Sequence, residues 1–251
     1  MIDCPSPSRI PELRQLWKEA FDDGDDVLDS FFSTAFSPER CRCVTLDGRL
    51  AAALYWFDCR CRGKKMAYLY AVATGKAFRG RGICHALVAD THAHLHTLGY
   101  AGTILVPAGP ELFGMYAGMG YLPGTSIREL ECSAPAEPVR LRRIDAGEYA
   151  RCRAELLPPG SVLLEGPGLA YLEDQYLLYR GEDFLLAAEI TAGGILRGEE
   201  LLGSAAAASG ILGAMGATHG VFRIPGGEKA YSMYCPLESH CPIPEYFGLA
   251  F

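Results

Sequence analysis

Two glycines one residue apart are the feature of this sequence that most constrains its fold. Gly80 and Gly82 lie in the stretch Phe78-Arg-Gly-Arg-Gly-Ile-Cys84, after a segment with strand character and before one with helical periodicity. Glycine lets a chain turn tightly and lets backbone N–H groups point at one spot. The first turn of the following helix adds unpaired N–H groups and the positive end of the helix dipole. This glycine loop (residues 78–84) is therefore predicted to bind a pyrophosphate-like anion.

Two other phosphate-binding loops do not fit the spacing. A Rossmann turn, G-x-G-x-x-G, needs a third glycine where His85 stands. A P-loop needs Gly-Lys followed by Ser or Thr, which this sequence lacks.

The segments around the glycine loop follow a definite order of elements. Apolar periodicity predicts a helix over 11–21, a second short helix with Val27, Phe31 and Ala35, and a helix from the loop to Leu98. Alternating and aromatic segments predict strands, with Asp47-Gly48 as a hairpin turn. The predicted strands are 41–46, 49–61, 66–74 and 103–106, followed by a short helix over 111–119 and a closing hairpin whose edges are Tyr121 and 127–132.

The second half of the chain repeats this order without a glycine loop. A stretch of proline and small residues at 133–138 is typical of a linker. Beyond it we predict strands over 139–142, 184–190, 195–202, 220–224 and 230–235, with helices over 146–156, from Leu169, and over 204–215. With 251 residues, 49% of them apolar, the chain has material for two packed domains, predicted as 1–135 and 136–251.

The charge balance narrows the classes of partner. The chain has 23 Lys and Arg against 30 Asp and Glu, a net charge of −7, and no block of basic residues. Binding to a nucleic-acid backbone depends on clustered cations, so no nucleic-acid partner is expected. No apolar run is long enough to span a bilayer, and the first residues do not resemble a signal peptide. We therefore expect a cytoplasmic protein with no membrane partner.

Ten cysteines raise the question of a metal or of disulfides. Their two tight pairs, 41/43 and 59/61, are C-x-C rather than C-x-x-C, a spacing that does not suit a zinc knuckle. We expect most of the cysteines to be small buried apolar residues. His92 and His96 have the spacing of a helical metal pair but lack an acidic third ligand, so we place them on a wet polar face. The aspartates of 22–26 lack the ligand spacing of a calcium loop, and no metal cofactor is expected.

Two motifs together resemble one protein family. Leu69-Tyr-Ala-Val-Ala-Thr74 followed by the glycine loop and His85-Ala-Leu87 is similar to the strand, acyl-CoA loop and helix of the GCN5-related N-acetyltransferases (GNAT). Leu112-Phe-Gly-Met-Tyr116-Ala-Gly-Met-Gly-Tyr121 resembles the second signature of that family. The resemblance implies an α/β fold, with a mixed, mostly antiparallel sheet and flanking helices. The second half resembles the degenerate GNAT-like domain of the tandem branch, which lacks the CoA loop.

The resemblance also implies roles for individual residues, with acetyl-CoA as the co-substrate. Tyr116 would be the general acid that protonates the departing thiolate. Backbone groups of three strand residues would bind the pantetheine and polarise the thioester carbonyl: Val72, Ala73 and Thr74. Backbone N–H groups of seven residues would hold the pyrophosphate: Arg79, Gly80, Arg81, Gly82, Ile83, Cys84 and His85. Cys84 departs from the family, which has Gly or Ala there, and its thiol could crowd the pyrophosphate.

The sequence does not identify a single residue as the general base. Some relatives carry a glutamate where this sequence has Met66. The alternatives are Asp58, a tyrosine at position 55, 68 or 70, a carboxylate of the second domain, and the terminal carboxylate of Phe251. The segment 244–251 is too apolar for a loose tail, so we expect it to dock against the body of the protein.

The expected activity is acetyl transfer to the primary amine of a small cationic molecule. The acidic residues at 22–26 either attract that cation or cap the second helix, and the sequence favours neither. The rival hypotheses are a non-catalytic acyl-CoA sensor and a protein or peptide N-acetyltransferase. The oligomeric state is open, with a homo-oligomer as one option.

Overall fold

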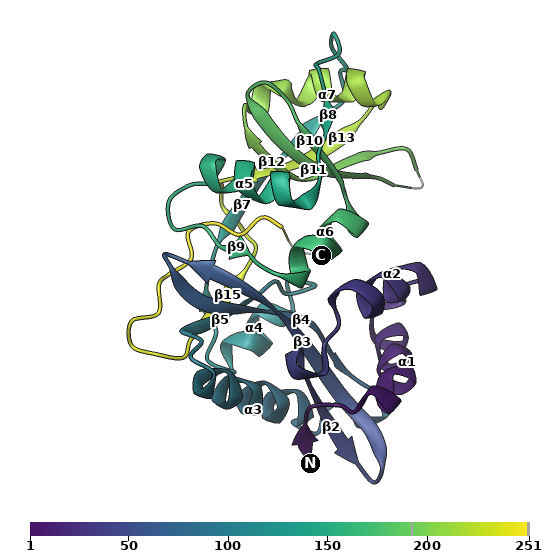
Figure 1. The fold of residues 1–251 in the computed structure, drawn as a ribbon, viewed down its shortest axis with the longest axis vertical. Helices are drawn as coiled ribbons and strands as arrows, with labels where there is room; N and C mark the ends of the chain where they lie inside the picture. The colour runs from purple at the N-terminus through teal and green to yellow at the C-terminus, as the bar shows by residue number, and fades with distance from the viewer. Residues whose placement is uncertain (192, 250–251) are drawn as a thin grey trace. The chain divides into compact units, whose positions relative to one another are not determined.

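The computed structural model, which describes residues 1–191 and 193–249, contains two mixed sheets (Figure 1). The chain divides into two units that exchange segments. Unit 1 comprises Met1–Leu122, Leu164–Tyr171 and Met233–Pro242. Unit 2 comprises Pro123–Leu163, Leu172–Ser232 and Ile243–Phe251. These bounds differ from the predicted division at 135/136, because each unit includes segments from both sides of it.

The first sheet has the strand order β1-β2-β3-β4-β5-β15-β6, with β9 paired to β3 off this path. Only the β4–β5 pair is parallel among the pairings described in this sheet. The strands are β1 Ile2–Asp3, β2 Cys41–Leu46, β3 Arg49–Cys61, β4 Lys64–Thr74, β5 Gly102–Leu105, β6 Leu122–Pro123, β9 Leu163–Leu164 and β15 Met233–Pro236. The helices of unit 1 are α1 Ile10–Phe21, α2 Asp25–Ser30, α3 Ile83–Thr97 and α4 Leu112–Ala117, and a π-helical turn η2 at Phe31–Ala35 extends α2.

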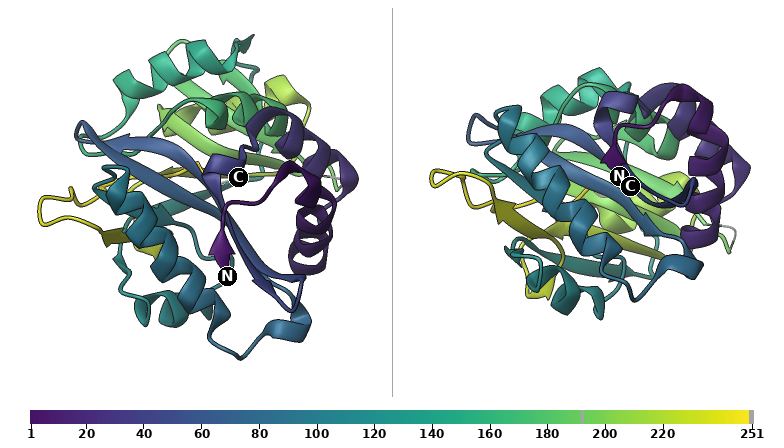
Figure 2. Two further views of the ribbon diagram at one scale, coloured as in Figure 1. Left: turned by 60° about the horizontal axis from the view of Figure 1, so that its bottom comes forward. Right: turned by 90° about the horizontal axis from the view of Figure 1, so that it is seen from below.

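The alternation of β3 places two kinds of core on the two faces of this sheet. Leu54 and Trp56 belong to a core that also contains Leu87 and Val88 of α3. Tyr55 and Phe57, on the opposite face, contact the aromatic rings of α1 and η2. Successive strand residues point to opposite faces, so α1 and α3 cover opposite sides of the sheet, as Figure 2 shows.

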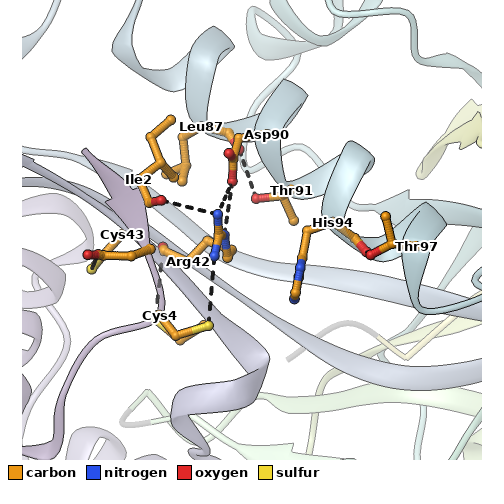
Figure 3. A network of polar contacts seen from close by, with 11 residues as sticks. Ile2, Cys4, Arg42, Cys43, Leu87, Asp90, Thr91, His94 and Thr97 are labelled. Carbon is orange, nitrogen blue, oxygen red and sulfur yellow. Dashed lines mark hydrogen bonds and ion pairs between the residues drawn. The ribbon is translucent and has the colours of Figure 1, made fainter.

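An ion pair fixes α3 to the strands that it covers (Figure 3). Arg42 of β2 donates from Nε and Nη2 to Oδ2 of Asp90 in α3, at 2.9 and 2.5 Å. Its Nη2 also donates to the carbonyl oxygen of Ile2 in β1, at 3.2 Å. Because α3 begins at the glycine loop, this clamp contributes to holding the loop in place.

The second sheet has the order β14-β7-β13-β12-β11-β10-β8, and β12–β13 is its parallel pair. Its core comes from β11, β12, β13 and α7. The strands are β7 Ser126–Cys132, β8 Arg142–Arg143, β10 Leu177–Arg180, β11 Phe184–Ile190, β12 Leu196–Gly203, β13 Gly220–Pro225 and β14 Lys229–Ala230. The helices of this region are α5 Ala146–Leu156, α6 Pro167–Gln175 and α7 Ala208–Met215. Two mixed sheets with flanking helices confirm the predicted α/β class.

The predicted closing hairpin is wrong. β7 does not pair with the segment around Tyr121; it pairs antiparallel with β13 and β14 in the second sheet. The place beside β5 is taken by β15, whose Met233–Pro236 pairs antiparallel with Gly102–Leu105. The predicted single strand over 230–235 is correspondingly divided, since β14 joins one sheet and β15 the other.

The cysteines match the interpretation as buried apolar residues. All ten are free, and six of them are buried: Cys41, Cys43, Cys59, Cys61, Cys152 and Cys235. Within 1–191 and 193–249, no helix is both long and apolar enough to cross a membrane.

Candidate active site

A gap between two strands forms one side of the candidate site. β4 pairs with β5 only from Met66↔Gly102 to Tyr68↔Ile104. The rest of β4 is not paired with β5, and its ladder with β3 contains a bulge between Tyr70 and Ala73. Ala71 has φ +46°, a left-handed conformation that is rare for a residue with a side chain. Such strain marks functional sites, and here it lies where the strand turns away from its neighbour, next to Val72, Ala73 and Thr74.

The glycine loop and the start of α3 form the adjoining side. Gly80 and Gly82 both have φ +72°. A Cβ built at either position would meet no atom within 4 Å, so the backbone conformation, rather than lack of space, calls for glycine. Gly82 is the N-cap of α3, a helix of 15 residues, and no side chain caps its first N–H groups. These N–H groups are free to bind an anion.

A cleft of about 770 Å³ opens between these segments. Nine of the predicted cofactor-binding residues line it: Val72, Ala73, Thr74, Arg79, Gly80, Gly82, Ile83, Cys84 and His85. Tyr116 lines it as well, whereas Arg81 does not. The cleft also has residues that the sequence did not single out, among them Ala20 and Phe21 at the end of α1 and Met115 and Met119 around α4.

Tyr116 sits in the cleft wall with 7% of its surface exposed. Its hydroxyl has no hydrogen-bond partner among the described residues. Burial raises the pKa of Tyr116 above its ordinary value, and the nearby Cys84 thiol adds to the shift. Tyr116 therefore keeps its proton at neutral pH. The Cys84 thiol is half-buried, and burial raises its pKa too.

A buried polar cluster stands behind Tyr116. The Tyr116 ring meets Tyr121 edge-on, with centroids 5.6 Å apart. The Tyr121 hydroxyl lies 3.0 Å from Nε2 of His92 and 2.9 Å from Oγ1 of Thr103. Burial lowers the pKa of His92 to about 4, so its ring is neutral at pH 7. The prediction of a wet polar face is thus wrong for His92, although His96 is exposed.

Asp58, one candidate base, is engaged elsewhere in unit 1. Its Oδ2 accepts hydrogen bonds from Nε and Nη2 of Arg40, at 3.1 and 2.7 Å, and its Oδ1 accepts one from the Tyr100 hydroxyl. Burial raises the pKa of Asp58, but these hydrogen bonds outweigh it and leave the pKa below its ordinary value. Asp58 does not line the cleft. These contacts make it a structural carboxylate and a poor base.

The tyrosine candidates lie on the aromatic side of the first sheet. Tyr55 and Tyr68 are buried there. The Tyr70 hydroxyl lies 3.2 Å from the hydroxyl of Tyr171. Burial raises the pKa of Tyr55 well above its ordinary value. None of the three lines the cleft.

The acidic residues after α1 have local partners. Asp22 ends α1 with φ +61°, and Asp23 accepts a hydrogen bond from Nε1 of Trp17 at 2.7 Å. Asp25 pairs with Lys18 and Arg14, at 2.5 and 3.3 Å. Asp25 and Asp26 occupy the first turn of α2 but make no side-chain cap. In the part of the chain that the structure describes, no group of three or more His, Cys, Asp or Glu could hold a metal ion.

The C-terminal segment docks on unit 2 as far as it is described. The N–H of Val162 donates to the carbonyl oxygen of Tyr246 at 2.8 Å, and Nη1 of Arg223 donates to that of Gly248 at 3.0 Å. Phe247 and Leu249 are fully buried. Phe251, the predicted base, lies outside the described residues.

Comparisons with known proteins agree with this geometry. Residues 3–124 match the family model of an acetyltransferase (GNAT) domain. A search of curated proteins found no match.

The fold is similar to that of a GCN5-related N-acetyltransferase from Kribbella flavida, at 16% identity over 93% of this chain and 70% of that one, with a TM-score of 0.69. A GCN5-related N-acetyltransferase from Anabaena variabilis has 17% identity over 95% of this chain and 73% of that one, with a TM-score of 0.69. A putative acetyltransferase from Pyrococcus horikoshii has 14% identity over 100% and 94%, with a TM-score of 0.65.

Proposed function

Since residues 3–124 make this chain a member of the GCN5-related N-acetyltransferase family, we propose that it acetylates the primary amine of a small cationic molecule. A domain of this family is an acyltransferase that takes its acetyl group from acetyl-CoA. The observation that carries the proposal is the cleft in which the parted β4, the glycine loop and Tyr116 meet.

The backbone supplies the binding groups. N–H groups of the glycine loop and of the first turn of α3 hold the pyrophosphate, with Cys84 as the side chain beside them. Backbone groups of Val72, Ala73 and Thr74 bind the pantetheine and polarise the thioester carbonyl. A fixed donor aimed at developing oxyanion charge contributes about 3 kcal/mol in comparable sites.

Tyr116 supplies the proton for the leaving thiolate. Its pKa lies above that of an ordinary thiol, which would disfavour the transfer in water. The apolar wall that raises the pKa of Tyr116 also destabilises a thiolate formed in the same cleft, because both anions lose solvation there. The leaving group therefore becomes basic enough to take the proton.

The proposal extends to the base. Because Asp58 is held by Arg40 and Tyr100, we keep the terminal carboxylate of Phe251 as a candidate base that the following variants test. Removal of Ala250 and Phe251 should lower turnover and leave CoA affinity unchanged. A chain with one glycine added after Phe251 keeps the ring and moves the carboxylate, so it should lose turnover as well. Full turnover in both variants would contradict this role.

Thiol release from acetyl-CoA over a panel of amines tests the proposal. We expect turnover with polyamines or other small cationic amines, and a loss of about 100-fold in Tyr116→Phe at unchanged acetyl-CoA affinity. Tyr234→Phe, which removes a β15 hydroxyl outside the cleft lining, is the matched control and should retain activity.

Two outcomes would favour the rival functions. CoA binding without turnover on any amine, and without an effect of Tyr116→Phe, would indicate an acyl-CoA sensor. Turnover confined to peptides would indicate a protein acetyltransferase.

A further inference from the structure

Tyr116 belongs to a helix that is too short to hold its side chain in place. α4 has only six residues, Leu112–Ala117, and isolated helices of this length are not stable in water. In the part of the chain that the structure describes, the Tyr116 hydroxyl has no hydrogen-bond partner, so no side-chain hydrogen bond orients it. The direction of the hydroxyl therefore depends on what packs against the Tyr116 ring.

Tyr121 contacts Tyr116 through both its backbone and its ring. The backbone N–H of Tyr121 donates to the carbonyl oxygen of Tyr116 at 3.1 Å. The two rings meet with an angle of 67° between their planes and with centroids 5.6 Å apart. This edge-to-face arrangement is a favourable one for two aromatic rings. A shift of the Tyr121 ring would therefore change the support of the Tyr116 ring.

The Tyr121 hydroxyl is in turn anchored to two other elements of unit 1. It lies 2.9 Å from Oγ1 of Thr103 in β5 and 3.0 Å from Nε2 of His92 in α3. The Thr103 and His92 atoms lie 3.2 Å from each other, so each of the three groups contacts the other two. Tyr121 and Thr103 are buried, with 2% and 0% of their surfaces exposed. Displacement of either side chain would leave a buried polar atom unpaired, which makes this position of the ring a favoured one.

The anchoring elements are the ones that shape the cleft. β5 is the strand from which β4 separates, and α3 begins at the glycine loop. Tyr121 thus connects Tyr116 to both of them, although Tyr121 itself does not line the cleft.

We propose that Tyr121 is a positioning residue that holds the Tyr116 hydroxyl toward the departing CoA sulfur, and that it does so through its hydrogen bonds to Thr103 and His92. The inference rests on the proposed function, in which Tyr116 donates the proton. Proton transfer needs donor and acceptor within about 3.2 Å of each other, so a displaced Tyr116 ring lowers the rate. The affinity for acetyl-CoA should not change, because the proposed binding groups belong to the backbone of β4 and the glycine loop.

Tyr121→Phe keeps the ring and removes the anchoring hydroxyl. We expect kcat, measured by thiol release with the best amine of the panel, to fall by about tenfold, less than the loss in Tyr116→Phe. The affinity for acetyl-CoA, measured by titration calorimetry, should stay within about twofold. Thr103→Val removes the neighbouring hydroxyl and should cause a similar loss of kcat. Thr103→Ser keeps a hydroxyl there and should retain most of the activity.

A double-mutant cycle separates positioning from a general loss of structure. If Tyr121 acts through the Tyr116 hydroxyl, Tyr121→Phe should not lower the residual kcat of Tyr116→Phe any further. Two losses that multiply in the double variant would overturn the inference. Full kcat in Tyr121→Phe, together with a large loss in Tyr116→Phe, would overturn it as well and leave the proposed acid standing. Full kcat in Tyr116→Phe would contradict the proposed acid itself.

Tyr100→Phe is the matched control for the loss of a buried tyrosine hydroxyl. Tyr100 is 4% exposed, and its hydroxyl donates to Asp58 and accepts from Nε1 of Trp56, outside the cleft lining. Tyr100→Phe should lower the free energy of unfolding and leave kcat unchanged. An equal loss of kcat in Tyr100→Phe and Tyr121→Phe would show a general effect of destabilisation and overturn the inference.

Discussion

At the scale of the residue, burial decides which side chains can exchange a proton. Tyr116 and Cys84 both face the cleft with a raised pKa, so they are neutral at pH 7. Asp58 is charged but held by Arg40 and Tyr100. The cleft thus contains a protonated Tyr116, the proposed proton donor, whereas Asp58 is held in contacts outside the cleft.

The half-buried His92, with its lowered pKa, predicts a pH dependence of stability. Its pKa is lowered from 6.5 to about 4 in the folded chain, so the unfolded chain binds a proton that the folded chain does not as the pH falls through 6.5. Above pH 6.5 His92 is neutral in both states and its contribution to the free energy of unfolding is fully present. As the pH falls from 6.5 to 4, the free energy of unfolding decreases by about 3 kcal/mol because of this group. Urea unfolding from pH 7 to pH 4 measures the loss. His92→Gln keeps polar atoms near Tyr121 and should flatten this part of the curve; an unchanged curve would contradict the assignment.

Asp58 gives a second prediction at this scale. Asp58→Asn weakens the contacts to Arg40 and Tyr100, so the free energy of unfolding should fall by about 1–3 kcal/mol. Turnover and CoA affinity should be unchanged, since the residue does not line the cleft. Denaturant unfolding and thiol release measure the two effects separately. A variant that is stable but inactive would restore Asp58 as the base.

At the scale of the element, the start of α3 depends on a backbone conformation that only glycine adopts easily. Gly82 has φ +72° at the N-cap, and the Arg42–Asp90 ion pair fixes the helix behind it. The hairpin turn between β3 and β4 has a similar glycine, Gly63, with φ +78°. Neither position has an atom within 4 Å of a built Cβ. Alanine should therefore cause similar backbone strain at either position, but only Gly82 lies beside the N–H groups that we propose bind CoA.

Gly82→Ala should lower both stability and CoA affinity. An alanine in the left-handed region costs about 1–2 kcal/mol, and relaxing that strain turns the loop N–H groups away from the ligand. Gly63→Ala carries the same strain at a position that does not line the cleft, so it should lose similar stability and keep its CoA affinity. Thermal unfolding and calorimetry on both variants measure this. Equal CoA affinity in the two variants would contradict the role of the glycine loop.

Most elements could be predicted from the sequence, but strand pairing could not. Periodicity located β2, β3, β4 and α3, and glycine spacing indicated the loop that lines the cleft, because these signals are local. Alternation shows that 126–132 is a strand but does not show which strand it joins, so its pairing with β13 was missed. The burial of His92 was missed for a similar reason. Its partners Thr103 and Tyr121 belong to other segments, and their approach is a property of the packed core.

At the scale of the whole molecule, the two sheets share the same arrangement of a parallel strand pair connected by a helix. In each, a parallel pair is separated in sequence by a helix, β4–α3–β5 in the first and β12–α7–β13 in the second. Each pair also separates after three residue pairs. The strand beside β5 is β15 and the one beside β13 is β7, so each sheet is completed by a strand exchanged between the two parts of the chain.

The place where β12 and β13 separate is occupied by other groups of unit 2, unlike the place where β4 and β5 separate. Beyond the last β12–β13 pair, Gly198↔Phe222, Arg223 donates to the carbonyl oxygens of Glu199 and Gly248 at 3.2 and 3.0 Å. Ala207 stands at the N-cap of α7, where the first unit has Gly82. The tail and an arginine thus occupy the part of unit 2 that corresponds to the open side of β4. We therefore expect unit 2 to bind no CoA.

Titration calorimetry with acetyl-CoA on the folded protein tests whether the cleft at the glycine loop binds the co-substrate. Among the described residues, the glycine loop combines uncapped N–H groups with a parted strand, so we expect saturable heat with one molecule bound per chain and weaker binding in Gly82→Ala. Circular dichroism and a cooperative thermal transition on the same sample establish that the protein is folded. The absence of binding heat at several temperatures from such a sample would contradict CoA binding at the glycine loop.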